Sequence, residues 1–221
     1  MHAGFRYFLD WPGLMMIMVL SMLINFLLNP AASLLPLLVT DHFGQGVIEL
    51  GWLESAFGLG ILIGGIALSV WGGFKKKIIT SMSGLIGLGI AFSMLGFLPP
   101  NQFGFAIISA FGAALMLPIV NGPILAILQD AVDPDMQGRV FSLLGSLSGA
   151  MAPLGLLIAG PLADATNIQI WFVIAGAACS MAGLAGFFIP AVMQIEENRK
   201  GESIAAEGES VPDASQVAAA V

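Results

Sequence analysis

The chain of 221 residues is 57% hydrophobic and only 10% charged. Because soluble domains are about one quarter charged, this composition excludes a water-soluble globule and indicates a protein solvated largely by lipid. The net charge of −7 says little about a partner, because six of the acids lie in the segment after residue 195; no nucleic-acid partner is expected.

Long uncharged gaps between the ionised residues predict an all-α bundle of six membrane-spanning helices. A helix needs about 20 apolar residues to cross a hydrocarbon core, and Pro99-Pro100-Asn101-Gln102 divides the longest gap into a hairpin of two helices. The predicted bundle covers residues 12–193, with spans at 12–39, 48–72, 78–98, 103–129, 139–162 and 168–193. Residues 1–11 are expected to be a cytoplasmic linker, and residues 194–221 a disordered acidic cytoplasmic tail.

The basic residues indicate how the bundle is oriented. If six helices alternate in direction, all Lys and Arg residues fall on one side: Arg6, Lys75, Lys76, Lys77, Arg139, Arg199 and Lys200. Short cytoplasmic loops are enriched in Lys and Arg. We therefore expect a multi-pass protein of the plasma membrane with both termini in the cytoplasm.

The first span carries the triplet Asn29-Pro30-Ala31, which is of the kind found in water and glycerol channels. Ser21, Asn25, Asn29 and Ser33 recur every four positions and so share one helical face. We interpret this face as the lining of a cavity, although Asn and Ser also join transmembrane helices as packing contacts. Pro30 should release a carbonyl near Phe26, and Asn29 is expected to help satisfy the loosened turn.

Two other function classes that fit six spans are disfavoured. An aquaporin-like channel has two Asn-Pro-Ala turns at the tips of half-helices, whereas the nearest second candidate here is Asn121-Gly122-Pro123. An intramembrane enzyme needs a base beside its nucleophile, and the only histidines, His2 and His42, lie outside the predicted spans. We therefore expect no enzyme activity, no metal site and no cofactor.

Glu54 is the one acid clearly within a span. An ionisable side chain at membrane depth is costly and is usually functional. Glu54 is therefore the candidate for proton coupling or for contact with a cation. The alternative is that its carboxylate reaches the outer surface, which its modest depth of about 9 Å permits.

Two spans carry ridges of small residues, which let helix backbones approach each other closely. The ridges are Ala56, Gly60 and Gly64 in the second span, and Gly145, Gly149, Pro153 and Gly155 in the fifth. We expect these two helices to form an interface with another six-helix half. Packing inside this bundle alone is the alternative.

Division of the spans into two triplets makes the first span equivalent to the fourth. Both carry polar residues and prolines at mid-span, and such matching interruptions point to the substrate site of a secondary transporter. The predicted substrate pathway comprises Ser21, Asn25, Asn29, Met116 and Asn121. Helix kinks are expected at Pro30, Pro118, Pro123 and Pro153.

Two segments resemble a known family. They are Trp71-Gly72-Gly73-Phe74-Lys75-Lys76-Lys77, and Asn121–Gln129 followed by Pro134–Ser142. On these segments the chain resembles the C-terminal half of a major facilitator superfamily transporter, in the branch of macrolide and multidrug efflux permeases. The resemblance implies helices seven to twelve of a twelve-helix fold, arranged as a 3+3 inverted repeat, and proton-coupled export of amphipathic, drug-like small molecules.

Two departures from the family pattern affect these expectations. The family's cytoplasmic loop has an Asp before its basic residues, but Trp71-Gly72-Gly73 stands there. Asp130, Asp133 and Asp135, on the next cytoplasmic loop with Arg139, are therefore the candidate partners for the Lys75–Lys77 cluster, in pairs that are usually weak when exposed. The first six helices of a family member are also absent. We expect a fragment that needs an N-terminal six-helix half as its partner; a homodimer and an inert remnant are the alternatives.

Overall fold

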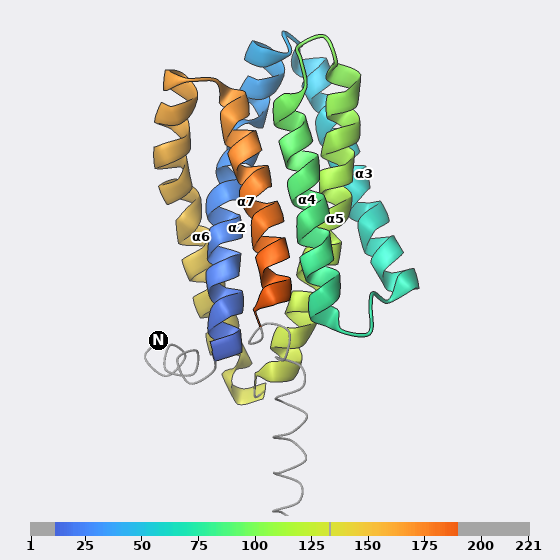
Figure 1. Cartoon of the computed structure of the whole chain (residues 1–221), viewed down its shortest axis with the longest axis vertical. Helices are drawn as coiled ribbons and strands as arrows, with labels where there is room; N and C mark the ends of the chain where they lie inside the picture. The colour runs from blue at the N-terminus through green and yellow to red at the C-terminus, as the bar shows by residue number, and fades with distance from the viewer. Residues whose placement is uncertain (1–11, 133, 190–221) are drawn as a thin grey trace, which may run out of the picture.

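The computed structural model describes residues 12–132 and 134–189 and is helical along most of this length (Figure 1). Its elements are α2 (Pro12–Leu37), the π-helical turn η1 (Leu38–His42), α3 (Val47–Trp71), α4 (Lys77–Phe97), α5 (Phe103–Ala131), α6 (Pro134–Ala165) and α7 (Ile168–Phe188). Each of the six α-helices in this part of the chain is long and apolar enough to cross a membrane. The predicted all-α bundle of six spans is therefore confirmed. The predicted linker at 1–11, the tail at 194–221 and the end of the sixth span lie outside the described residues.

Polar turns extend two of the helices beyond the predicted spans. The first helix continues through η1 to His42, past the predicted end at residue 39, and α6 begins at Pro134 instead of at residue 139. A proline suits the first turn of a helix, because its missing N–H would have no partner there. The length of an apolar run measures only the part of a helix that crosses lipid, so it does not report such polar ends.

The helices run side by side along the long axis of the molecule, and the triplets α2–α4 and α5–α7 make partly equivalent contacts (Figure 1). At the centre, α4 packs on α7 and also on α5. Outside this core, α3 packs on α5, and α6 packs on α2. In an inverted repeat of two triplets, α2 is equivalent to α5 and α3 is equivalent to α6. The contact of α3 with α5 is then the counterpart of the contact of α6 with α2, as expected of such a repeat.

Glycines permit the closest of these helix crossings. A Cβ built on Gly155 of α6 would overlap the carbonyl oxygen of Phe26 and lie 2.6 Å from Cγ of Pro30 in α2. At the equivalent crossing, a Cβ on Gly64 of α3 would lie 2.9 Å from the carbonyl carbon of Leu115 in α5. Small residues are required at such crossings because the two backbones come together there.

Three glycines of the predicted interface ridges are therefore used inside this chain. Besides Gly64 and Gly155, a Cβ on Gly60 would lie 2.7 Å from a side-chain carbon of α5. For these three positions the structure shows the alternative, packing within the bundle, because their side of the helix is already covered. Gly145 and Gly149 are different: both are exposed, and a Cβ there would meet nothing within 4 Å.

The two helices at the edges of the view, α6 and α3, are the least covered ones (Figure 1). In the most apolar window of each helix, 56% of the residues are buried in α4, but only 17% in α3 and 6% in α6. Each of these two edge helices thus packs inside the bundle on one side and leaves most of its surface open.

Candidate functional site

The polar face predicted on the first span forms a ladder of hydrogen bonds within α2. Asn25 Nδ2 donates to the carbonyl oxygen of Ser21 at 2.8 Å, and Asn29 Nδ2 donates to the carbonyl oxygen and to Oδ1 of Asn25 at 3.0 and 2.9 Å. Ser33 Oγ continues the ladder by donating to the carbonyl oxygen of Asn29 at 3.0 Å. Every one of these bonds stays within α2, so they do not join this helix to a neighbour.

The equivalent residues of α5 point in different directions. The exposed Asn121 donates from Nδ2 to the carbonyl oxygen of Leu117 at 3.0 Å, again within its own helix. Met116 instead packs against α4, where a Cβ on Gly87 would lie 3.0 Å from its sulfur atom. Met116 therefore belongs to the packing between helices.

The prolines predicted to interrupt the helices all lie inside α-helices, and two of them have a neighbouring carbonyl bound by another helix. A proline in a helix leaves carbonyls of the preceding turn without their usual N–H partner. Near Pro30, the indole Nε1 of Trp171 in α7 donates to the carbonyl oxygen of Leu27 at 3.1 Å. Near Pro123, Ser81 Oγ in α4 donates to the carbonyl oxygen of Val120 at 2.8 Å.

These two bonds are equivalent in the inverted repeat, because each joins the first turns of a central helix to a proline-containing helix. The carbonyl that loses its N–H partner to Pro30 is that of Phe26, and Trp171 binds the adjacent carbonyl of Leu27. Asn29 binds the carbonyl oxygen and the side chain of Asn25 in the same turn. Sequence reasoning missed Trp171, although an indole N–H in a span with few other donors is a signal that it needs an acceptor.

Glu54 lines a cavity of about 240 Å³, called here the Glu54 pocket. Three aromatic rings form part of its wall: Phe57 from α3, Phe92 from α4 and Phe172 from α7. Phe92 and Phe172 stack with their ring centroids 6.2 Å apart and their planes 13° from parallel. The remaining wall is aliphatic and comprises Ala31, Ala32, Leu35, Leu95, Ala110 and Ala113. The pocket therefore combines one exposed carboxylate with an aromatic and aliphatic surface.

A larger cavity of about 550 Å³, called here the η1-end cavity, opens where α2 and α6 diverge beyond their crossing at Gly155. Its polar lining comes from both helices and from the start of α7, and comprises Ser33, Asp41, His42, Asp164, Thr166, Asn167 and Gln169. A third cavity of about 210 Å³, between α2, α4, α5 and α7, is lined by apolar residues only. None of the five residues of the predicted substrate pathway lines these three cavities, and their role stays a prediction.

His42 joins three elements at the η1 end. Its imidazole Nε2 lies 2.9 Å from the carbonyl oxygen of Leu98, just after α4, and 2.6 Å from the amide nitrogen of Gln169 in α7. The Gln169 amide also donates to the carbonyl oxygen of Leu98 at 3.3 Å. Sequence reasoning missed this cluster because its members are far apart in the chain; the only signal was an imidazole at the end of an apolar run.

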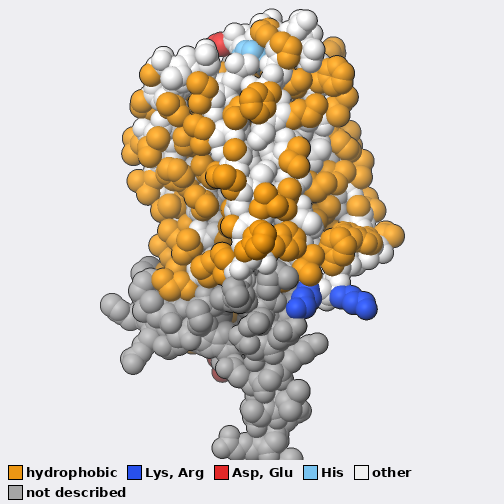
Figure 2. Space-filling view, viewed as in Figure 1, with side chains coloured by type: hydrophobic (Ala, Val, Ile, Leu, Met, Phe, Trp, Pro, Cys, Tyr) orange, Lys and Arg blue, Asp and Glu red, His pale blue; other side chains and the backbone are white. Residues whose placement is uncertain are grey.

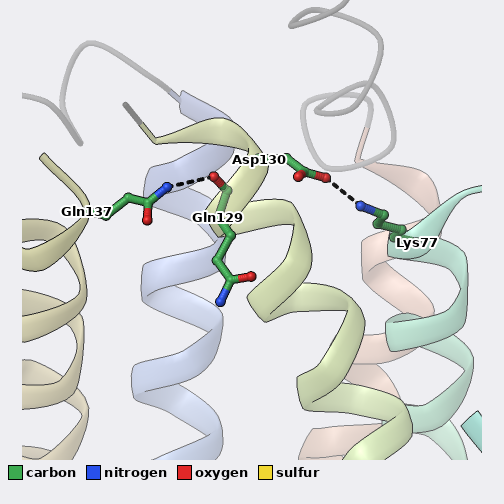
Figure 3. A network of polar contacts seen from close by, with 4 residues as sticks. All are labelled: Lys77, Gln129, Asp130 and Gln137. Atoms are coloured by element: carbon green, nitrogen blue, oxygen red, sulfur yellow. Dashed lines mark hydrogen bonds and ion pairs between the residues drawn. The ribbon is translucent and has the colours of Figure 1, made fainter. Parts of the chain in front are cut away.

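The opposite end, called here the lysine end, carries a second polar network (Figure 3). Lys77 at the start of α4 forms an ion pair with Asp130 near the end of α5. Gln137 Nε2 donates to the carbonyl oxygens of Gln129 and Val132 at 3.0 and 3.2 Å, which ties the start of α6 to the end of α5. The structure thus brings together Asp130 and one lysine of the predicted cluster.

On the face drawn in Figure 2, the charged side chains of the described residues lie near the two ends of the bundle, whereas Glu54 belongs to α3. In that view lysines lie at the lower end, an acidic side chain and a histidine lie at the upper end, and hydrophobic side chains cover the face between them. This distribution is that of a bundle immersed in lipid along its length.

Comparisons with known proteins agree on one family. The family model described as Major Facilitator Superfamily matches residues 14–217. Macrolide efflux protein A of Streptococcus pyogenes is 29% identical over 176 residues, which are 80% of this chain and 44% of that protein. The protein of the same name from Enterococcus faecalis is 30% identical over 156 residues, or 71% of this chain and 48% of that protein.

A third relative is the multidrug efflux pump Tap of Mycolicibacterium fortuitum. It is 29% identical over 198 residues, which are 87% of this chain and 46% of that protein. The chain spans about half the length of the curated relatives it matches.

Proposed function

The chain belongs to the Major Facilitator Superfamily, and from this membership we propose that it forms one six-helix half of a transporter that exports amphipathic cations in exchange for protons. The single observation that carries this proposal is the Glu54 pocket. A carboxylate beside aromatic rings is an arrangement that binds organic cations, because the ring faces are negative and the apolar wall accepts the rest of the molecule.

Exchange follows from the chemistry of a single carboxylate. The Glu54 side chain holds either a proton or a cationic ligand, because protonation removes the charge that attracts the cation. Proton entry therefore favours release of the cation, and cation binding favours release of the proton. An acid at membrane depth that does both couples the two movements.

The names of the relatives support export and a small-molecule substrate. Two are called macrolide efflux protein A and one is called a multidrug efflux pump. We propose the same class of activity for the transporter that contains this chain, and no enzyme activity. The adaptable, mostly apolar wall of the Glu54 pocket suits several ligands better than one.

The proposed location is the plasma membrane, with the lysine end in the cytoplasm. Lys75 and Lys76 lie in the short connection between α3 and α4, next to the ion-paired Lys77 at the start of α4. Positive charge in short loops favours the cytoplasmic side. On this assignment the η1 end, with Asp41 and Asp164, faces outward.

The proposed partner is an N-terminal six-helix half that covers the open faces of α3 and α6. In these two helices a Cβ would meet nothing within 4 Å at seven glycines: Gly51, Gly58 and Gly65 of α3, and Gly138, Gly145, Gly149 and Gly160 of α6. On α3 this open stripe lies on a different side of the helix from Gly60 and Gly64, which face α5. Open small-residue stripes on both edge helices suit close packing against further helices.

Replacement of Glu54 by Gln tests the proposed function. We expect Glu54→Gln to lower the efflux of a cationic dye at least about tenfold, since a charged contact is worth about 1.5–3 kcal/mol and about 1.4 kcal/mol is tenfold. The measurement is dye efflux at several external pH values, in cells that express this chain together with an N-terminal half.

Glu49→Gln is the matched control, because Glu49 lies on the same helix but accepts a hydrogen bond from the backbone N–H of Gly46 at 3.0 Å instead of lining the pocket. It should leave efflux unchanged. Unaltered efflux and pH dependence in Glu54→Gln would remove Glu54 from the mechanism and, with it, the observation on which the proposal rests.

A further inference from the structure

The wall of the Glu54 pocket comes from several helices of this chain. Its residues are Ala31, Ala32 and Leu35 of α2, Glu54 and Phe57 of α3, Phe92 and Leu95 of α4, Ala110 and Ala113 of α5, and Phe172 of α7. The pocket therefore forms without a contribution from an N-terminal half.

The exposure of these residues divides the wall into a rim and a floor. The rim consists of the exposed Glu54 and Ala32 and the partly buried Leu35, Phe57 and Phe92. The floor is almost fully buried, and its residues Ala31, Leu95, Ala110, Ala113 and Phe172 are 0%, 2%, 2%, 1% and 0% exposed. The one charged group of the pocket thus lies at the rim, and the floor is apolar throughout.

This division of the wall orients an amphipathic cation. Glu54 and Phe57 lie three residues apart on α3, so their side chains share one face of the helix. A positive charge at the rim is attracted to the carboxylate and to the negative face of the ring. The side chains of the floor carry no polar atom, so a charge placed there would lose its hydration without a partner. The apolar group of a ligand should therefore enter first, and its charge should stay at the rim.

The volume of the pocket limits the size of the group that enters. The pocket measures about 240 Å³. A cavity of about 150 Å³ holds one benzene molecule, whereas pockets for drug-sized molecules measure about 300–1,000 Å³. The Glu54 pocket lies between these values. It therefore fits a single ring with a compact cationic group, and it excludes a body of several rings.

Alanines keep the pocket open at this size. Ala31, Ala110 and Ala113 belong to the floor, and Ala32 belongs to the rim. A longer side chain at one of these positions would extend into the pocket or over its mouth, because the packed interior behind the wall has no room for it. Ala32 is the best position for a test, since it is exposed and a larger side chain there displaces no buried neighbour.

We propose that the Glu54 pocket is a subsite for a compact organic cation that carries a single ring, and that the small side chain of Ala32 sets the upper limit on the group that enters. The ring lies on the apolar floor, and the cationic nitrogen lies between the carboxylate of Glu54 and the ring of Phe57. Transport of such a cation rests on the proposed function. Its binding requires this chain alone.

Equilibrium dialysis of the full purified chain in detergent, without an N-terminal half, tests the subsite with radiolabelled benzyltrimethylammonium. We expect saturable binding of this label. Unlabelled tetraphenylphosphonium carries the same charge on a much bulkier body of phenyl rings. It should displace the label at least about tenfold less effectively than unlabelled benzyltrimethylammonium, because a group larger than the pocket overpacks it. Leu35→Ala, which widens the rim, should reduce this difference.

Two substitutions at the rim test where the label binds. Ala32→Leu narrows the mouth and Glu54→Gln removes the charge, so each should weaken the binding of benzyltrimethylammonium about tenfold or more. Ala177→Leu is the matched control, because it makes the same enlargement at an exposed position of α7 that does not line the pocket. This variant should bind the label as the original chain does.

Absence of saturable binding, equal displacement by the two cations, or unchanged binding in Ala32→Leu would overturn the proposal. These outcomes are distinct from efflux measured with both halves. If the isolated chain does not bind the label but efflux depends on Glu54, the subsite is wrong and the proposed function stands. If the label binds as expected but efflux does not depend on Glu54, the subsite stands and the proposed function is wrong.

Discussion

Two glycines of α6 have opposite surroundings although both come from the same predicted ridge. Gly155 lies against the backbone of α2, where an added Cβ would overlap the carbonyl oxygen of Phe26. Gly149 faces open space, with nothing within 4 Å of such a Cβ. Replacement of each glycine by Ala, which adds one methyl group, therefore distinguishes a glycine that the helix packing requires from one that it does not require.

We expect Gly155→Ala to lower the free energy of unfolding by about 1–3 kcal/mol, the usual cost of an added group in a packed site. The backbone of α2 cannot yield as a flexible side chain would. Gly149→Ala, the control, should be neutral or slightly stabilising, because Ala favours a helix by about 1 kcal/mol over Gly. Unfolding of the purified chain in mixed micelles measures both, and equal stability of the two variants would contradict the crossing seen at Gly155.

For a single residue, the sequence predicts that a polar group needs a hydrogen-bond partner better than it predicts which residue that partner is. A weakened turn before Pro30 is predictable, because a proline in a helix leaves the carbonyl four residues earlier, here that of Phe26, without its N–H partner. The contact of Trp171 with the adjacent carbonyl of Leu27 is not predictable, since the two residues lie far apart in the chain. The same limit applies to Asn25 and Asn29, whose side chains satisfy each other and the backbone of α2.

Among the described residues, the ion pair between two helices lies at helix ends, whereas Trp171 and Ser81 donate to carbonyls in the middle of α2 and α5. At the lysine end the ion pair of Lys77 and Asp130 joins α4 to α5, and both side chains are well exposed, at 45% and 67%. An ion pair with this exposure is screened by water and salt, so its contribution to stability is small.

We expect Lys77→Gln to lower the free energy of unfolding by at most about 1 kcal/mol. The difference from the original chain should vanish near 1 M salt, where the screening length falls to about 3 Å. Lys75→Gln serves as control, since it removes the same charge two residues earlier, in the connection before α4. A loss well above 1 kcal/mol that persists in high salt would show that the pair is far less hydrated than its exposure indicates.

At the scale of the whole molecule, the open faces of α3 and α6 are the main unexplained surface. Exposed apolar residues are ordinary on a lipid-facing helix, so they do not by themselves mark an interface. The open glycines mark an interface more specifically. Two helix backbones can approach closely only where the residues between them are small, whereas contact with lipid chains has no such requirement. Their location on both edge helices fits a partner that touches the two edges together.

We expect Gly149→Leu to reduce binding of an N-terminal six-helix half about tenfold or more, because a large side chain in a close-packed helix contact costs about 1–3 kcal/mol. The chain itself should keep its stability, since nothing lies near that position. Co-purification of the two halves in detergent measures the effect. Ala177→Leu, which enlarges an exposed position of α7, is the control. A chain that forms a transport-competent homodimer without the second half would contradict the proposed partner.

The sequence by itself determined the number of spans, the all-α class and the concentration of charge at the ends of the helices. These properties depend on the local length of apolar runs measured against the thickness of a bilayer. It also indicated that α2 and α5 are equivalent in the repeat, because their matching mid-span interruptions are visible along the chain.

Only the tertiary structure decided which side of each helix is covered. Inside a membrane the faces toward lipid and toward protein are equally apolar, so hydrophobic periodicity does not distinguish them. For this reason Gly60, Gly64 and Gly155 fit an interface and an internal crossing equally well until the neighbouring helices are known. The contact of His42 with Gln169 likewise depends on two chain segments that meet only when all six spans are packed.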